Sequence, residues 1–396
     1  MKKAKIRVFF MIVVVIALFA AAITYSFLNP SIDVVPVDGQ EEEQNLSSPD
    51  TGISEEHDPE ISEVFFSRIH PYGEGHVYKL DWADFNNDGL LDLAIANYNR
   101  QNYLFINRNG SFERTPQFGS GYSVDVRWTD QNNDSLQDLI VLRYKHQSSI
   151  YFNQGSNIFL EKDVFSPGYS KAMVIEDFDN DGFDDVFVGH DGEEIYLDIN
   201  DKKGGFIETV IKTDWHILAL DSCDIDSDGL QDIVVGTDFG QNYIMINNGD
   251  NTFTPTPNFG EQDHTRAIIC EDVNNDGLPD VLVGNDRQSN NEEKNWIFVN
   301  NGNFDFTKTH ELGASVTYAM ATGDFNNDSL VDVAVGNYNQ ESVVYTNLGD
   351  FRFKKTKVLE KDYVRDISVD DIDNDGFADI STALDKNGLN IFINQA

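Results

Sequence analysis

The sequence is poor in cysteine, proline and basic residues. Of its 396 residues 2 are cysteine and 10 are proline, and 28 Lys and Arg stand against 68 Asp and Glu, a formal net charge of −40. This balance argues against a nucleic-acid partner, because phosphates are bound by basic patches. The cysteines, Cys223 and Cys270, can form one disulfide outside the cytoplasm, but we favour two small buried residues.

Motifs of common catalytic sites are also missing. There is no His-x-x-x-His or Cys-His cluster, no serine nucleophile motif, no Walker loop and no dinucleotide-binding glycine pattern. The sequence therefore favours a binding protein over an enzyme.

A nine-residue acidic motif is what the sequence has in abundance. Its form is D-x-[DN]-x-D-[GS]-x-x-D, and it occurs seven times, first as DFNNDGLLD from Asp84 to Asp92. Successive first aspartates are 46, 47, 47, 48, 52 and 47 residues apart. A fixed period of this kind is typical of a repeat architecture.

Each copy has the ligand pattern of a calcium loop. Oxygens of side chains 1, 3, 5 and 9 and of backbone carbonyl 7 can surround one hard cation. A helical EF-hand is excluded, because position 12 lacks glutamate and strand-like residues follow position 9. A metal-free acidic turn is the alternative, which seven copies disfavour since clustered carboxylates repel one another. The predicted ligands, loop by loop, are Asp84, Asn86, Asp88, Leu90 and Asp92; Asp130, Asn132, Asp134, Leu136 and Asp138; Asp177, Asp179, Asp181, Phe183 and Asp185; Asp224, Asp226, Asp228, Leu230 and Asp232; Asp272, Asn274, Asp276, Leu278 and Asp280; Asp324, Asn326, Asp328, Leu330 and Asp332; and Asp371, Asp373, Asp375, Phe377 and Asp379.

Two loops depart from the pattern at position 6, where Ser135 and Ser329 replace glycine. A non-glycine residue in a left-handed conformation costs about 1–2 kcal/mol. We therefore predict that the second and sixth loops bind metal more weakly than the others.

The first 62 residues do not follow the repeat. Within residues 1–28, four basic residues precede an apolar run, and residues 8–28 are long enough to span a bilayer as one helix. We expect an uncleaved anchor with the rest of the chain outside the cytoplasm, in the periplasm or at the cell surface. The alternative is a cleaved signal peptide and secretion, since Ala20-Ala21-Ala22 resembles a cleavage site. Residues 29–62 hold ten acidic residues and no Lys or Arg, which predicts a disordered tether.

Residues 63–396 carry four short strand patterns per repeat. An alternating run precedes each acidic loop, a Val/Ile/Leu run follows it, a third run ends in an Asn-rich turn, and a fourth begins at an aromatic residue. This pattern predicts an all-β, seven-bladed β-propeller of four-stranded blades. The last unit lacks its fourth strand, and residues 63–71 read as an orphan strand. We predict that this segment completes the last blade and closes the ring.

These repeats resemble the FG-GAP/VCBS repeat. Phe118-Gly119 and Phe259-Gly260 match the FG part, and Val283-Gly284 and Val335-Gly336 stand where the GAP part begins, although its Ala-Pro is missing. The resemblance implies the seven-bladed propeller of integrin α-subunits and bacterial surface proteins, with up to seven Ca²⁺ ions in the loops of one face. It also implies a partner on the opposite face and leaves that partner's identity open.

The opposite face can be located by counting back eight residues from each first aspartate. Flat amphipathic rings there suit a sugar or peptide surface, whereas packing between adjacent blades is the interpretation that repetition favours. The candidate ligand-binding residues are His76, Tyr122, Tyr169, His216, His264 and Tyr363, with Val316 at the remaining place. Residues 285–295, which lengthen one repeat, are either a functional specialisation of this face or a tolerated surface insertion.

The sequence thus predicts a membrane-tethered, extracytoplasmic calcium-binding propeller that binds a glycan or a protein. The alternative is a propeller-fold calcium-dependent polysaccharide lyase or hydrolase, which would need a catalytic base beside a basic cleft. The ligand-face loops offer six basic residues that nothing groups in the sequence: Arg100, Arg143, Lys145, Lys171, Arg266 and Arg365.

Overall fold

The computed structural model describes residues 66–72, 75–115, 118–165, 168–192, 194–213, 215–288 and 294–395. These residues belong to one compact unit, Asp58–Ala396. The predicted anchor at residues 8–28, the tether at 29–62 and the middle of the insertion lie outside the described residues. No helix in the described ranges is long and apolar enough to cross a membrane.

The described part of the chain is built from strands and contains no helix. In chain order the strands are β1 (Phe66–Tyr72), β2 (Val77–Ala83), β3 (Asp92–Asn107), β4 (Phe112–Arg114), β5 (Phe118–Thr129), β6 (Asp138–Arg143), β7 (Ser148–Asn153), β8 (Phe159–Phe165), β9 (Ser170–Glu176), β10 (Asp185–His190), β11 (Glu194–Asn200), β12 (Phe206–Lys212), β13 (Ile217–Cys223), β14 (Asp232–Asn247), β15 (Phe253–Pro255), β16 (Phe259–Glu271), β17 (Asp280–Gln288), β18 (Lys294–Asn300), β19 (Phe306–Ala314), β20 (Thr317–Gly323), β21 (Asp332–Asn347), β22 (Phe353–Asp370), β23 (Asp379–Leu384) and β24 (Gly388–Asn394).

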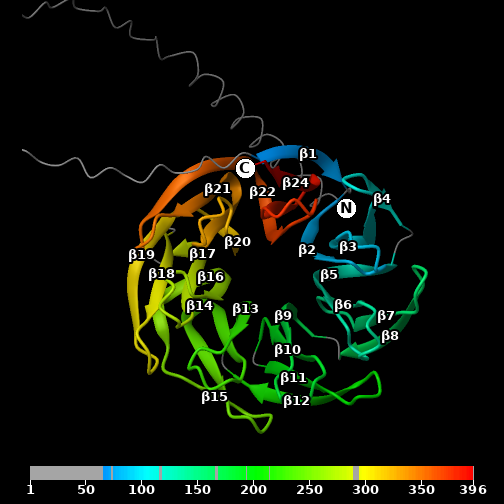
Figure 1. The fold of residues 1–396 in the computed structure, drawn as a ribbon. Helices are drawn as coiled ribbons and strands as arrows, with labels where there is room; N and C mark the ends of the chain where they lie inside the picture. Colours follow the sequence, from blue (N-terminus) through cyan, green and yellow to red (C-terminus); the bar gives the residue numbers. More distant parts are fainter. Residues whose placement is uncertain are drawn as a thin grey trace, which may run out of the picture. The chain divides into compact units, whose positions relative to one another are not determined.

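Antiparallel sheets follow one another around a common axis in chain order (Figure 1). A complete unit has four strands, as in the order β12-β11-β10-β9. The strands nearest the axis are β2, β9, β13 and β20 and the second halves of β5, β16 and β22 (Figure 1). We call these the inner strands. Each is followed by an acidic loop and then by a second strand that pairs with it.

The second strands form the core because both of their faces are covered by neighbouring sheets. Every residue of β6 and β10 is buried, which explains why these segments read as apolar runs rather than as alternating patterns. Apolar side chains of successive repeats mix between the sheets: Phe85 packs with Val126, Leu139 and Tyr151 of the next repeat. Burying each such side chain stabilises the fold by about 1.5–3 kcal/mol.

The N-terminal segment pairs with the last strand, as predicted. β1 runs antiparallel to β24, with Phe66 opposite Asn394 and Ile69 opposite Ile391. The first and last repeats also meet directly, because Lys79 Nζ bonds Asp366 Oδ1 at 2.7 Å. The two ends of the chain of sheets are therefore joined to each other.

The expectation for the cysteines is wrong. Cys223 on β13 and Cys270 on β16 form a disulfide, with Cα atoms 6.0 Å apart. That separation lies within the usual range for disulfides. The sequence did not foresee it, because the bond joins two different sheets, whose inner strands β13 and β16 lie next to each other around the axis (Figure 1).

Candidate metal centres

Each acidic loop closes a hairpin between an inner strand and a second strand. The residue before position 1 pairs with the position 9 aspartate, as Ala83 does with Asp92 and Glu176 with Asp185. Positions 4 and 6 have positive φ in all seven loops. Position 4 is Asn in six loops and Ser227 in the other, and Asn is the non-glycine residue that best tolerates this conformation.

Hydrogen bonds within each loop fix the carboxylates of positions 1 and 5. The position 1 carboxylate accepts the backbone N–H of position 5 at 2.9–3.2 Å and that of position 6 at 2.7–3.0 Å. The position 5 carboxylate accepts the N–H of position 7 at 2.9–3.1 Å. The same geometry in every loop means that the ligand oxygens are positioned before any ion arrives.

The position 9 aspartate is the buried member of each site. All seven are fully buried, and one oxygen of each accepts the backbone N–H of an asparagine 15 residues onward (20 in the lengthened repeat) at 2.7–3.0 Å. Burial, reinforced by neighbouring carboxylates of the loop, raises the pKa of each of these aspartates to about 7. A bound cation would hold these groups ionised in place of a proton.

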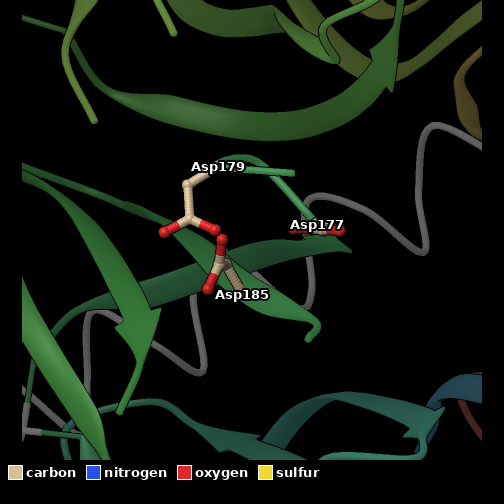
Figure 2. A group of neighbouring side chains, drawn as sticks. All are labelled: Asp177, Asp179 and Asp185. Atoms are coloured by element: carbon tan, nitrogen blue, oxygen red, sulfur yellow. The ribbon is translucent and has the colours of Figure 1, made fainter. Parts of the chain in front are cut away.

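The loops fall into two classes at position 3. The third, fourth and seventh loops have aspartate there, and ligand oxygens of positions 1, 3 and 9 lie within 4.8 Å of one another. Figure 2 shows the third loop, where the carboxylates of Asp179 and Asp185 point toward each other. The other four loops have asparagine, whose amide supplies one neutral oxygen. In the first loop the Asn86 amide donates to Asp92 Oδ2 at 2.8 Å.

A divalent oxygen-loving cation fits this donor set. The donors are carboxylates and an amide or carboxylate at position 3, which are calcium ligands by type. Three of the candidate oxygens, Asp138 Oδ2, Asp280 Oδ2 and Asp179 Oδ1, are buried and have no hydrogen-bond partner. Buried carboxylate oxygens without a partner are costly, and a cation would satisfy them.

The asparagine behind position 9 also links neighbouring repeats, which sequence reasoning missed. Its side-chain amide donates to the position 2 carbonyl of the preceding repeat in all seven cases, at 2.8–3.2 Å. In the first repeat the partner is Ile372 of the last, so the set of links is closed. The sequence signal for these links was the Asn-rich turn at the end of the third strand of each repeat, which was interpreted only as a turn.

The candidate ligand-binding residues lie at the opposite end of the inner strands. Each of them contacts the preceding repeat. The tyrosines meet tyrosines: the ring centroids of Tyr98 and Tyr122 are 4.9 Å apart, those of Tyr144 and Tyr169 5.6 Å, and those of Tyr338 and Tyr363 4.8 Å. The histidines meet aspartates: His216 bonds Asp191 at 3.0 Å, His76 bonds Asp385 at 3.0 Å, and His264 contacts Asp238. These are contacts between blades, although Tyr169 and His216 also stay exposed.

A second set of residues, six positions before the first aspartates, surrounds a cavity that the sequence analysis did not find. Lys171, Arg266, Arg365, Tyr78 and Tyr318 line this space, whose volume is about 310 Å³. Of the six basic residues named from the sequence, the structure brings these three together. Arg143 is instead buried away from it, donating to Ser149 Oγ at 2.9 Å and Tyr151 Oη at 2.8 Å. Counting back six residues from each first aspartate, instead of eight, would have selected Lys171, Arg266 and Arg365 together.

Comparison with known proteins bears on the fold and the family. The FG-GAP-like repeat model matches at residues 84–141, 130–188, 177–235, 224–283, 272–335 and 324–382. No curated protein matches the chain.

Solved structures with a similar fold include two of BBS1N in complex with ARL6DN. The crystal soaked with mercury gives a TM-score of 0.60 at 13% identity, over 84% of this chain and 97% of that one. The crystal soaked with lead gives 0.59 at 14% identity, over 84% and 96%. Raptor from Chaetomium thermophilum gives 0.59 at 13% identity, over 84% of this chain and 29% of Raptor.

At such identities these structures establish a likeness of fold alone, and it is a likeness to propellers. Each family match begins at the first aspartate of one acidic loop and ends three residues after the last aspartate of the next loop. Together the matches cover most of the chain. The loops themselves repeat one geometry from the first to the last. The chain belongs to the FG-GAP-like repeat family, and its repeats form a β-propeller.

Proposed function

We propose that this protein is a seven-bladed, calcium-stabilised propeller, anchored to a membrane by residues 8–28, that serves as a binding module for a protein partner. The observation that carries the proposal is the set of seven preorganised acidic loops on one end of the inner strands, with the opposite end left to vary. Binding rather than catalysis is proposed, because the repeated carboxylates are accounted for as metal ligands.

Calcium is supported by the loops' donor set. Positions 1, 3, 5 and 9 and the position 7 carbonyl would hold the ion in each loop, as their residue types suit calcium. When bound, calcium supplies positive charge that relieves repulsion among the carboxylates. The partnerless oxygens of Asp138, Asp179 and Asp280 support the same assignment.

A location outside the cytoplasm is supported by the disulfide between Cys223 and Cys270. Disulfides persist in oxidising compartments and are rare in the cytosol. An anchor formed by residues 8–28 would place the propeller in such a compartment, and residues 29–62 would hold it away from the bilayer.

A protein partner is supported by the fold. Propellers of this kind occur in protein complexes, as BBS1N does with ARL6DN. On this chain, the end of the inner strands away from the acidic loops presents exposed aromatic side chains, Tyr169 at 51% and Phe239 at 70% exposure. Aromatic residues are enriched at the centres of protein interfaces.

The proposal is tested by placing a photo-crosslinking amino acid at one site on the full chain expressed in its native membranes. Tyr169 marks the proposed docking face, and Val210 on the outer strand β12, 42% exposed, is the matched control. We expect a discrete crosslinked protein from position 169 that disappears with chelator. Crosslinks from position 210 alone would place the partner on the rim and contradict the proposal. Binding to a glycan array, lost when Tyr122, Tyr169 and Tyr363 become Ala, would favour a glycan ligand instead.

A further inference from the structure

The side chains that line the cavity between the inner strands are more basic than the chain as a whole. Five basic side chains line it, Lys79, Arg127, Lys171, Arg266 and Arg365, against two acidic ones, Asp125 and Asp366. Across the whole sequence, acidic residues outnumber basic ones by 68 to 28. A basic lining in so acidic a protein needs a reason of its own.

Four of these charged groups lie closer to the acidic loops along the inner strands and pair with one another, and we call the three basic residues at six positions before the first aspartates the outer cations. Lys79 Nζ bonds Asp366 Oδ1 at 2.7 Å, and Arg127 Nε lies 3.5 Å from Asp125 Oδ1. Both aspartates also accept backbone N–H groups of the next repeat, from Met173 at 3.2 Å and Leu80 at 3.1 Å. These four charged groups are structural, and their hydrogen bonds join neighbouring blades.

The three outer cations are held differently, by aromatic rings. Arg266 and Arg365 each lie 4.9 Å from the centroid of Tyr318 and therefore within about 10 Å of each other. Arg365 also lies 4.7 Å from the centroid of Tyr78. Lys171 lies 4.9 Å from that of Tyr144. The rings fix these cations at the cavity without neutralising them.

Among the described residues each outer cation pairs with one acidic side chain, so most of its N–H donors make no hydrogen bond there. Arg365 donates from Nη2 to Asp385 Oδ2 at 2.9 Å, and its Nε is buried with no hydrogen-bond partner. Arg266 bonds Asp286 through Nε at 2.5 Å, and Lys171 lies 3.2 Å from Asp191. A guanidinium has five N–H donors in a planar fork that matches carboxylate and phosphate oxygens.

Asp385 does not depend on Arg365 for its hydrogen bonds. It also accepts from Tyr338 Oη at 2.8 Å and contacts His76 Nδ1 at 3.0 Å. Its charge therefore stays satisfied if an incoming group takes over Nη2 of Arg365.

We propose that this cavity is a site for an oxyanion group, a carboxylate or phosphate, bound between Arg365, Arg266 and Lys171. The proposal rests on the proposed function in one respect: the natural source of the group would be an acidic side chain of the protein partner. A cationic group is disfavoured because the chain's own cations already cover the rings. Stacking of a sugar on Tyr318 is disfavoured for the same reason.

The test is isothermal titration calorimetry on the full chain in detergent with calcium, at physiological ionic strength. Separate titrations use inorganic phosphate, glutarate and hexaglutamate peptide as probes. The variants are Arg365→Gln and Arg365→Lys, and Arg114→Gln is the matched control, since Arg114 lies 4.8 Å from the Tyr103 centroid outside the cavity. Melting curves of all variants confirm that each is folded.

We expect saturable binding of at least one probe, weakened tenfold or more by Arg365→Gln and unchanged by Arg114→Gln. Arg365→Lys should fall between, because lysine keeps the charge but loses the fork. Tighter binding of hexaglutamate than of glutarate would indicate a protein source for the group, and tighter phosphate binding a phosphate-bearing ligand. No binding of any probe, or equal weakening by Arg114→Gln, would overturn the site. Continued crosslinking from position 169 in that case would leave the proposed function standing.

Discussion

The two ends of the inner strands lie about 20 Å apart, the length of a seven-residue strand, and they differ in what they keep from repeat to repeat. At the loop end the same residue type recurs: aspartate at positions 1, 5 and 9 and asparagine behind them. At the mouth, defined by the candidate ligand-binding residues and the cavity, the contact recurs but is a Tyr–Tyr pair in three places and an Asp–His pair in three others.

The difference teaches what repetition means in a propeller. At the loop end every repeat needs the same side-chain oxygens, because few other groups could bind a cation and also accept the backbone N–H bonds of the loop. At the mouth, any pair of complementary shape joins two blades, so residues there are free to acquire a ligand's chemistry. We therefore expect changes at the loop end to lower stability and changes at the mouth to alter binding.

Removing calcium should have the largest effect. One site filled at a hundred times its Kd adds about 2.7 kcal/mol to the free energy of unfolding, so several sites together add on the order of 10 kcal/mol. Calorimetric melting with calcium and with chelator measures this, and the Arg365→Gln variant at the mouth should shift Tm by far less. Equal curves with and without calcium would remove the contrast between the two ends.

Removing the disulfide should come second. Cys223 and Cys270 stand one and two residues before the first aspartates of their loops and are 47 residues apart, a separation for which loop-closure entropy sets an upper value of about 4 kcal/mol. We expect the double variant Cys223→Ser, Cys270→Ser to lose 2–4 kcal/mol in denaturant unfolding, consistent with that magnitude. The parent under reducing conditions is the control and should show a similar loss; an unchanged midpoint in both would contradict the prediction.

Calcium should remove a fall of stability with rising pH that the metal-free fold shows. Without metal, the folded pKa of the position 9 aspartates is about 7, against about 3.9 in an unfolded chain. The folded state then holds more protons between about pH 4 and pH 7, so stability falls as pH rises through that window. With calcium the ligands must be ionised in the folded state, as they already are in the unfolded chain above about pH 5, so stability should stay nearly level from there to pH 7. Parallel melting series from pH 4 to 8 measure both slopes, and identical slopes would argue against metal at these residues.

Replacing serine by glycine at position 6 should have the smallest effect. Ser135 and Ser329 both have φ of 67°, and glycine at this position in other loops has open space where a Cβ would stand. The preference for glycine is therefore conformational, and Ser135→Gly should add about 1 kcal/mol to stability. Calcium titration of that variant should show a tighter second loop, and the reverse change Gly277→Ser should weaken the fifth. No change in either variant would refute the predicted ranking of loops.

The fold was predictable because its signals are local and repeated. The acidic motif located every hairpin, and the orphan strand near residue 66 was found from what the last repeat lacked. The position 9 aspartates followed from calcium chemistry, but their burial and raised pKa depend on neighbouring sheets. The disulfide could not be predicted, because it depends on how separate blades are rotated about the axis, whereas counting back six residues from each first aspartate would have grouped Lys171, Arg266 and Arg365.

The asparagine links between repeats would turn the proposed calcium sites into a closed one-dimensional lattice. Each position 9 carboxylate accepts the backbone N–H of the asparagine in its own repeat, and the side-chain amide of that asparagine donates to the loop of the preceding repeat. The series of links is closed, because the first repeat is linked to the last. Such a lattice has nearest-neighbour coupling and no terminal site, so each ion that binds orders the loops on both sides of it. Calcium uptake should then be cooperative, and the ring should switch between empty and filled over a narrow range of calcium concentration.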